Sequence, residues 1–219
     1  TTSTANVTID FGTNAGSGTL SGTKTVAAVS GVATFSDLSI NNTANGYTLT
    51  ATSSGLTSAT SNTFNISNSG AAKLAFSVQP SNATAGTSIS PAIKVQILDA
   101  AGNPTTATDN ITLSIDTNPA SGTLSGTLTQ AAVAGEATFS DISINKSSAS
   151  SYKLKATSGS LTETISNTFI ISPNTPTTIT VTDITPSVGV MGINNNFVRV
   201  NLLDAYGNFS PAPSDIGVE

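Results

Sequence analysis

The chain has 219 residues, 9% of them charged, with a formal net charge of −5 and no His, Cys or Trp. The lack of His and Cys excludes a His-based catalytic triad, a thiol nucleophile, a disulfide and a His/Cys zinc site. Seven Lys and Arg residues are too few to follow a phosphate backbone, so we expect no nucleic-acid partner. No apolar run nears the roughly 20 residues that cross a bilayer, so we expect no membrane insertion in this segment.

From residue 74 onward, apolar side chains alternate with polar or small ones at a period of two, not the 3.6 of a helix. Each run is short, rich in β-branched residues and bounded by Gly, Asn, Pro or Asp, as is typical of strands joined by turns. The expected strands, in chain order, include 74–78, 93–97, 111–115, 152–156 and 169–171. About seven strands in about 100 residues indicate an all-β, two-sheet sandwich.

An internal repeat of about 105 residues runs through the chain. The offset is 104 in the early motifs and 105 after a one-residue insertion near Tyr47 and Tyr152. Four motifs recur in the same order: 18–23, 33–40, 61–64 and 98–103 return as 122–127, 137–144, 166–169 and 203–208.

The phase of this repeat divides the chain into three segments. Residues 1–68 are expected to be the later part of one repeat, 72–172 a complete repeat and 176–219 the opening part of a third. The joints at 68–70 and 172–176 are polar and rich in turn-forming residues, which is typical of short linkers. We expect these 219 residues to be either a segment of a longer chain or a subunit that polymerises.

One position in the repeat changes the parity of its apolar residues. Phe139 has an odd number, whereas Ile142 and Ile144 have even ones, so a bulge or corner must separate them. Asp141 falls at that corner, and Asp37 falls at the corresponding place one repeat earlier. We interpret both aspartates as turn residues whose carboxylates accept backbone N–H groups.

The recurring motif at Asp99 to Asn103 and Asp204 to Asn208 is the strongest candidate for a binding site. Oxygen atoms of Asp, Asn and exposed carbonyls suit Ca²⁺. Asp at the first position and Gly at the fourth is also ordinary type I turn chemistry. The sequence lacks the carboxylate-rich loop of a calcium-binding hand, so we favour the turn and keep Ca²⁺ as the alternative.

Together, the motifs at 98–104, 122–127, 137–144 and 152–158 resemble bacterial immunoglobulin-like repeats. Such repeats form the stalks of invasin- and intimin-type adhesins and other large surface proteins. The resemblance implies tandem Ig-like sandwiches at the cell surface and no enzymatic activity. Tyr47 and Tyr152 open the penultimate strand, where Ig-like folds often place a corner tyrosine bonded to the backbone.

These observations favour a non-catalytic, extracellular structural repeat, a stalk or filament segment of a cell-surface protein. The expected partners are neighbouring repeats or subunits, with self-assembly by β-strand complementation as one form. The twelve carboxylates are scattered, and no local pair suits acid–base catalysis. The alternative is an adhesin module that binds carbohydrate or a host protein through loop aromatics, for which Tyr206 and Phe209 are the candidates.

Overall fold

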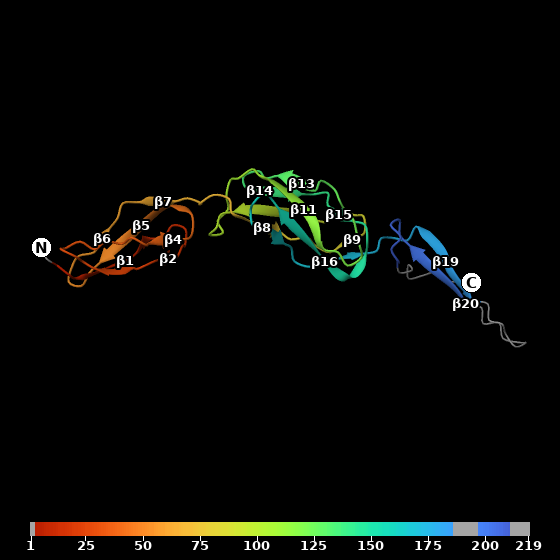
Figure 1. Cartoon of the computed structure of the whole chain (residues 1–219), viewed down its shortest axis with the longest axis horizontal. Coiled ribbons are helices and arrows are strands. Elements are labelled where there is room, and N and C mark those ends of the chain that lie inside the picture. Colours follow the sequence, from red (N-terminus) through yellow and green to blue (C-terminus); the bar gives the residue numbers. More distant parts are fainter. Residues whose placement is uncertain (1–2, 186–196, 211–219) are drawn as a thin grey trace, which may run out of the picture. The chain divides into compact units, whose positions relative to one another are not determined.

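The computed structural model describes residues 3–185 and 197–210 (Figure 1). These residues form strands and turns and no helix, which confirms the all-β class expected from the alternating pattern. The described residues therefore contain no helix that is long and apolar enough to cross a membrane. The chain divides into two compact units: unit 1 comprises residues 1–72 and 98–105, and unit 2 comprises residues 73–97 and 106–219.

Unit 1 is organised around β5, which pairs antiparallel with β1, β6 and β7, while β3 extends the sheet beyond β1. A separate two-stranded pair joins β2 to β4. The strands are β1 (Asn6–Thr13), β2 (Leu20–Ser21), β3 (Thr25–Ala27), β4 (Ser39–Ile40), β5 (Ala44–Thr52), β6 (Ala59–Thr60) and β7 (Phe64–Ile66).

Unit 2 contains a sheet in the order β13-β11-β16-β18-β9, with β17 also on β16, and a second sheet in the order β14-β10-β8. The pairs β12–β15 and β19–β20 complete it. The strands are β8 (Lys73–Val78), β9 (Ala83–Thr84), β10 (Ile93–Leu98), β11 (Asn110–Thr117), β12 (Leu124–Ser125), β13 (Thr129–Ala131), β14 (Glu136–Phe139), β15 (Ser143–Ile144), β16 (Ser148–Thr157), β17 (Thr164–Ile165), β18 (Phe169–Ser172), β19 (Thr178–Thr185) and β20 (Phe197–Leu203).

The strand registers of the two units match at the offset seen in the sequence. Thr8 lies opposite Thr52 in unit 1, and Thr112 lies opposite Thr157 in unit 2. Both β1 and β11 carry a bulge near their ends, after Phe11 in β1 and after Ile115 in β11. Equivalent residues of these paired strands thus occupy equivalent positions in both units.

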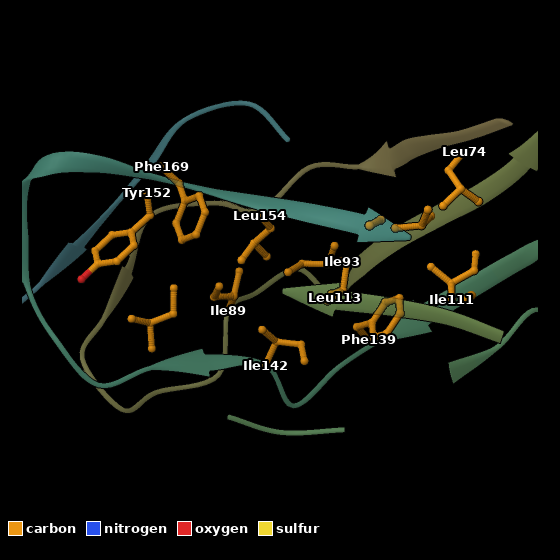
Figure 2. Close-up of a cluster of buried hydrophobic side chains, with 14 of the residues drawn as sticks. Leu74, Ile89, Ile93, Ile111, Leu113, Phe139, Ile142, Tyr152, Leu154 and Phe169 are labelled. Carbon is orange, nitrogen blue, oxygen red and sulfur yellow. The ribbon is translucent and has the colours of Figure 1, made fainter. Parts of the chain in front are cut away.

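The core of unit 2 lies between its two sheets (Figure 2). Alternate residues of β10 are buried and half-buried, as the period of two predicts, and Ile93, Val95 and Ile97 have no exposed surface. Figure 2 shows Ile93 and Phe139 beside Leu113 and Leu154, which come from the other sheet. This arrangement agrees with the expected two-sheet sandwich.

Unit 1 has a smaller core, made largely of stacked aromatic rings. Tyr47 is fully buried, and its ring centroid lies 5.8 Å from that of Phe11 and 6.0 Å from that of Phe64. Leu20 is also buried, but Leu38 and Leu49 are only half-buried, although their equivalents Ile142 and Leu154 are fully buried in unit 2.

The two compact units do not coincide with the three segments expected from the sequence. Residues 98–105 belong to unit 1 although the repeat places them in the complete segment 72–172, and residues 176–219 share unit 2 with most of that segment. The assignment of three repeat segments therefore remains a prediction from the sequence.

Candidate functional site: two aspartate–asparagine turns

The five residues Asp99 to Asn103 form a closed turn directly after β10. The Asp99 N–H donates to the Asn103 carbonyl at 2.9 Å, and the Gly102 N–H donates to the Asp99 carbonyl at 3.1 Å. The Asn103 N–H and Nδ2 donate to the Asp99 carboxylate at 2.8 and 3.1 Å. Gly102 has a φ of +98°, a conformation open to glycine and costly for other residues. The Asp99 carboxylate therefore stabilises the turn by accepting hydrogen bonds from its last residue, Asn103.

This turn is also hydrogen-bonded to two other segments of unit 1. The Asn103 Nδ2 donates to the Asn41 carbonyl at 2.9 Å, and the Thr43 N–H donates to Asn103 Oδ1 at 3.4 Å. The Ser69 N–H donates to Asp99 Oδ2 at 3.2 Å. One side-chain amide thus serves a backbone donor and a backbone acceptor of the 41–43 loop, in the way that a neighbouring strand would.

The second turn, Asp204 to Asn208, repeats this pattern within unit 2. The Asn208 N–H and Nδ2 donate to the Asp204 carboxylate at 2.9 and 2.8 Å. The same Nδ2 donates to the Asn145 carbonyl at 3.0 Å, and the Ser147 N–H donates to Asn208 Oδ1 at 3.0 Å. The Asn174 N–H donates to Asp204 Oδ2 at 3.0 Å. Each bond has a counterpart in the first turn, one repeat earlier.

Tyr206 adds contacts that the first turn, with Ala101 at this position, does not share. The Tyr206 ring lies directly over Gly86, where a Cβ would collide with it. Lys146 Nζ donates to the Tyr206 carbonyl at 2.6 Å. The exposed fraction of Tyr206 is 39%, against 70% for Phe209. From the sequence, Tyr206 is expected to be a loop aromatic, and Gly86 gives no signal, because no local pattern links residues 120 positions apart.

Both aspartates have a pKa below that of a free aspartate side chain. The Asn103 side chain, together with the backbone N–H groups of Asn103, Ser69 and Gly102, holds the pKa of Asp99 below its usual value of 3.8. Burial raises the pKa of Asp204, but hydrogen bonds from Asn208, Asn174 and Tyr206 outweigh burial and leave the pKa below 3.8.

The donors around these carboxylates bear on the Ca²⁺ alternative. Each carboxylate faces N–H groups, which a cation would have to displace. Over residues 3–185 and 197–210, three or more acidic, His or Cys side chains nowhere gather as a metal site would require. Asp99, Asn103, Asp204 and Asn208 have the geometry of a hydrogen-bonded turn, and a bound ion stays an untested alternative.

Tyr47 and Tyr152 lie at equivalent places near the middle of β5 and β16, the longest strands of the two units, and not at the strand start that the sequence suggests. The Tyr152 hydroxyl donates to the Lys146 carbonyl at 2.8 Å, and the Tyr47 hydroxyl donates to the Asn42 carbonyl at 2.9 Å. Burial raises the pKa of the Tyr152 phenol. Each hydroxyl therefore fastens the loop that carries the contacts of an Asp–Asn turn.

Asp37 and Asp141 each bind one threonine fourteen residues upstream. The Thr127 N–H donates to both carboxylate oxygens of Asp141 at 3.0 and 2.9 Å, and its hydroxyl donates at 2.7 Å. Thr23 makes the same three bonds to Asp37. Hydrogen bonds from these threonines keep the pKa of both carboxyls below the usual value. Their side chains bridge two loops, with the geometry of a structural clamp.

No protein-family model and no curated protein matches the chain. Among solved structures, it is similar to surface layer protein SbsC, domains 4–9, with a TM-score of 0.36 and 19% identity over 94% of this chain and 29% of that one. It is also similar to a β-glycosidase from Bacteroides vulgatus, with a TM-score of 0.39 and 13% identity over 76% of this chain and 21% of that one. The chain spans less than a third of either protein. Likenesses this weak identify neither a fold family nor a function.

Proposed function

We propose that this chain is a non-catalytic structural segment of an extracellular, cell-surface protein, built from tandem Ig-like repeats. The observation that carries the proposal is the duplicated turn. Each Asp–Asn turn directly follows an equivalent strand, β10 or β20, and is hydrogen-bonded to a loop of the repeat before it, at 41–43 or at 145–147.

The chemistry of the turns supports a mechanical role. Asn208 is 6% exposed and Asp204 is 2% exposed, so water competes little for their hydrogen bonds. The bonds join backbone groups of three separate segments, which restricts motion between successive repeats. A stalk or filament segment needs this property, because its repeats must transmit tension and resist bending.

The proposal is tested by the mobility of the third repeat's strands. In ¹⁵N relaxation measurements on the full chain, we expect the amides of β20 to tumble with those of β16. Asn208→Ala should shorten the effective correlation time of β20 and leave that of β16 unchanged. Asn45→Ala, at an exposed residue of β5, is the matched control. Unchanged relaxation in Asn208→Ala would refute the mechanical role.

The location is tested separately. Antibodies raised against the complete repeat, residues 72–172, should label intact cells of the source organism without permeabilisation. Labelling that requires permeabilised cells would contradict a place on the surface.

Phe209 favours a second candidate function, an adhesin module. Its ring is 70% exposed and lies at the end of the second turn, where it could stack on a sugar. Glycan-array binding that is lost in Phe209→Ala and retained in Tyr206→Ala would support this function, because Tyr206 already packs on Gly86.

A further inference from the structure

The chain contains seven Asn-x-Ser/Thr sequences, the acceptor pattern for N-linked glycosylation. So short a pattern also arises by chance in a chain rich in Asn, Ser and Thr, and the sequence alone selects none of the seven. The hydrogen bonds of the seven side chains, by contrast, divide them into two groups. The acceptor asparagines are Asn6, Asn41, Asn65, Asn82, Asn110, Asn145 and Asn208, and all lie in the described part of the chain.

Five of these asparagines are held by the protein through their side-chain amides. In each of them the amide oxygen accepts a backbone N–H at 2.7–3.0 Å. Asn208, which is 6% exposed, also donates from Nδ2 to Asp204 and to Asn145. These bonds account for an asparagine at each of the five places. The N–H donors are Thr19 for Asn41, Gly46 for Asn65, Ile170 for Asn82, Thr123 for Asn145 and Ser147 for Asn208.

Asn6 and Asn110 form the second group. They are equivalent at the offset of 104 residues, and both are exposed. Their side-chain amides make no hydrogen bond to any residue that the structure describes. Asparagine is depleted in strands, yet Asn6 opens β1 and Asn110 opens β11, each with a threonine two residues later. No contact within the described residues accounts for asparagine at this position of the repeat.

The place of Asn110 on its sheet leaves room for a bulky group. Ile111 is fully buried, so Asn110 points to the outer face of β11. Asn110 is paired with Ala131 on β13, and Asn6 is paired in the same way with an exposed alanine on β3. β3 and β13 are the last strands of their sheets. Each free amide therefore has a small, exposed neighbour on an edge strand.

An exposed valine follows that alanine along the edge strand. The Ala132 N–H donates to the Asp109 carbonyl at 3.1 Å, so the pairing continues past β13, and buried Ala132 leaves Val133 on the outer side. Val133 is thus a diagonal neighbour of Asn110, and such positions are about 7–8 Å apart. Val133 is 77% exposed, and its counterpart Val29 is 75% exposed. A sugar ring attached to Asn110 would reach this apolar side chain.

We propose that Asn110 and Asn6 are N-glycosylation sites, and that the first sugar of each glycan packs on Val133 or Val29. In the transfer, Nδ2 of the asparagine attacks C1 of the first sugar of a polyprenyl-pyrophosphate-linked oligosaccharide. The N–C bond forms, the bond from C1 to the pyrophosphate oxygen breaks, polyprenyl pyrophosphate leaves, and Nδ2 gives up one proton. The transfer accompanies export, so this inference rests on the proposed extracellular location.

The sites are tested by measuring occupancy on the full chain secreted from yeast behind a cleavable signal sequence. Release of the glycans by an amidase in ¹⁸O-labelled water marks each occupied asparagine as a labelled aspartate, which mass spectrometry counts site by site. Asn110 and Asn6 should be occupied in most secreted chains. Asn208 should be occupied in few, because a sugar on its Nδ2 would disrupt the bonds to Asp204 and Asn145.

A Ser210→Thr chain makes Asn208 the matched control, since the acceptor sequences of Asn110 and Asn208 then both end in threonine. An unoccupied Asn110 would overturn the assignment. Equal occupancy of Asn110 and Asn208 would also contradict it, because the fold would then not select the site.

The sugar contact is tested by thermal unfolding after an endoglycosidase has trimmed each glycan to its first sugar. Compared with the same chain made without glycans, the trimmed chain should unfold about 2–4 °C higher, as partial burial of a valine side chain predicts. A Val29→Ser/Val133→Ser double variant should lose most of this gain. Ile165→Ser, at an exposed apolar residue of β17, is the control and should keep it.

Two thermal results would overturn the contact: no gain in the trimmed chain, or a gain that survives in the double valine variant. Neither they nor an unoccupied Asn110 would refute the structural role, because the relaxation test with Asn208→Ala needs no glycan.

Discussion

Replacing Tyr152 by Phe isolates one hydrogen bond in the core of unit 2. The hydroxyl is 2.8 Å from the Lys146 carbonyl, and the residue has no exposed surface. Phe keeps the ring beside Phe169, whose centroid is 6.1 Å away, and removes only the donor. The loss of one neutral hydrogen bond should lower the free energy of unfolding by about 1 kcal/mol. Tyr152→Ala, which also empties the ring's volume, should cost about 3–5 kcal/mol.

The assay is urea unfolding followed by far-ultraviolet circular dichroism. With an m-value of about 1–3 kcal/mol/M, Tyr152→Phe should lower the midpoint by about 0.3–1 M. Tyr206→Phe is the matched control, because its ring is partly exposed and the substitution should change the free energy by less than about 0.5 kcal/mol. An unchanged midpoint in Tyr152→Phe, or a loss as large as that of the Ala variant, would refute the role assigned to the hydroxyl.

Two further predictions concern the Asp–Asn turns, and a third concerns the loop that Asp141 clamps. The pKa values of Asp99 and Asp204 are lowered on folding, so these carboxylates stabilise the fold above pH 3.8 and lose that contribution as the pH falls through the folded value. Asp204→Asn should therefore weaken the fall in the free energy of unfolding at acidic pH. An unchanged fall would contradict a lowered pKa. EDTA should leave the thermal midpoint unchanged, since N–H groups already occupy the Asp99 carboxylate, whereas a fall reversed by added Ca²⁺ would establish an ion site. Gly126→Ala should lower the free energy of unfolding by about 1–3 kcal/mol, because φ is +114° and the new Cβ would lie 2.5 Å from the Asp141 carbonyl oxygen; Gly159→Ala, with no atom within 4 Å, should cost less, and equal losses in urea unfolding would count against the contact.

The all-β class could be predicted because alternation is a local property. In β10, Ile93, Val95 and Ile97 point to one side and are buried, as the period of two requires. The break between Phe139 and Ile142 was likewise visible as a change of parity, and β14 ends at Phe139 before β15 begins at Ser143.

Partner-dependent features could not be predicted in this way. Ala33-Thr34-Phe35 and Ala137-Thr138-Phe139 have the same sequence, yet only the second forms a strand, because β10 pairs with it. A motif-by-motif prediction assigns both stretches the same structure. Their difference depends on residues more than 40 positions upstream of Phe139.

The candidate site likewise has features that the local sequence predicts and features that depend on distant residues. The turn at Asp99, Gly102 and Asn103 can be predicted from the local sequence, because these residue types are typical of type I turns. The bonds from Asn103 to Asn41 and Thr43 cross about 60 residues and have no local signal.

Unit 1 is discontinuous in sequence, since residues 73–97 separate its two parts. Ribosomes make the chain from its N-terminus, so the loop 98–105 emerges after all of β8 and most of β10. The bonds of Asn103 to Asn41 and Thr43 can therefore form only after 60 further residues have been translated. A nascent chain halted at residue 72 would hold every strand of unit 1 and none of its closing turn. Completion of one repeat thus waits for translation of the next.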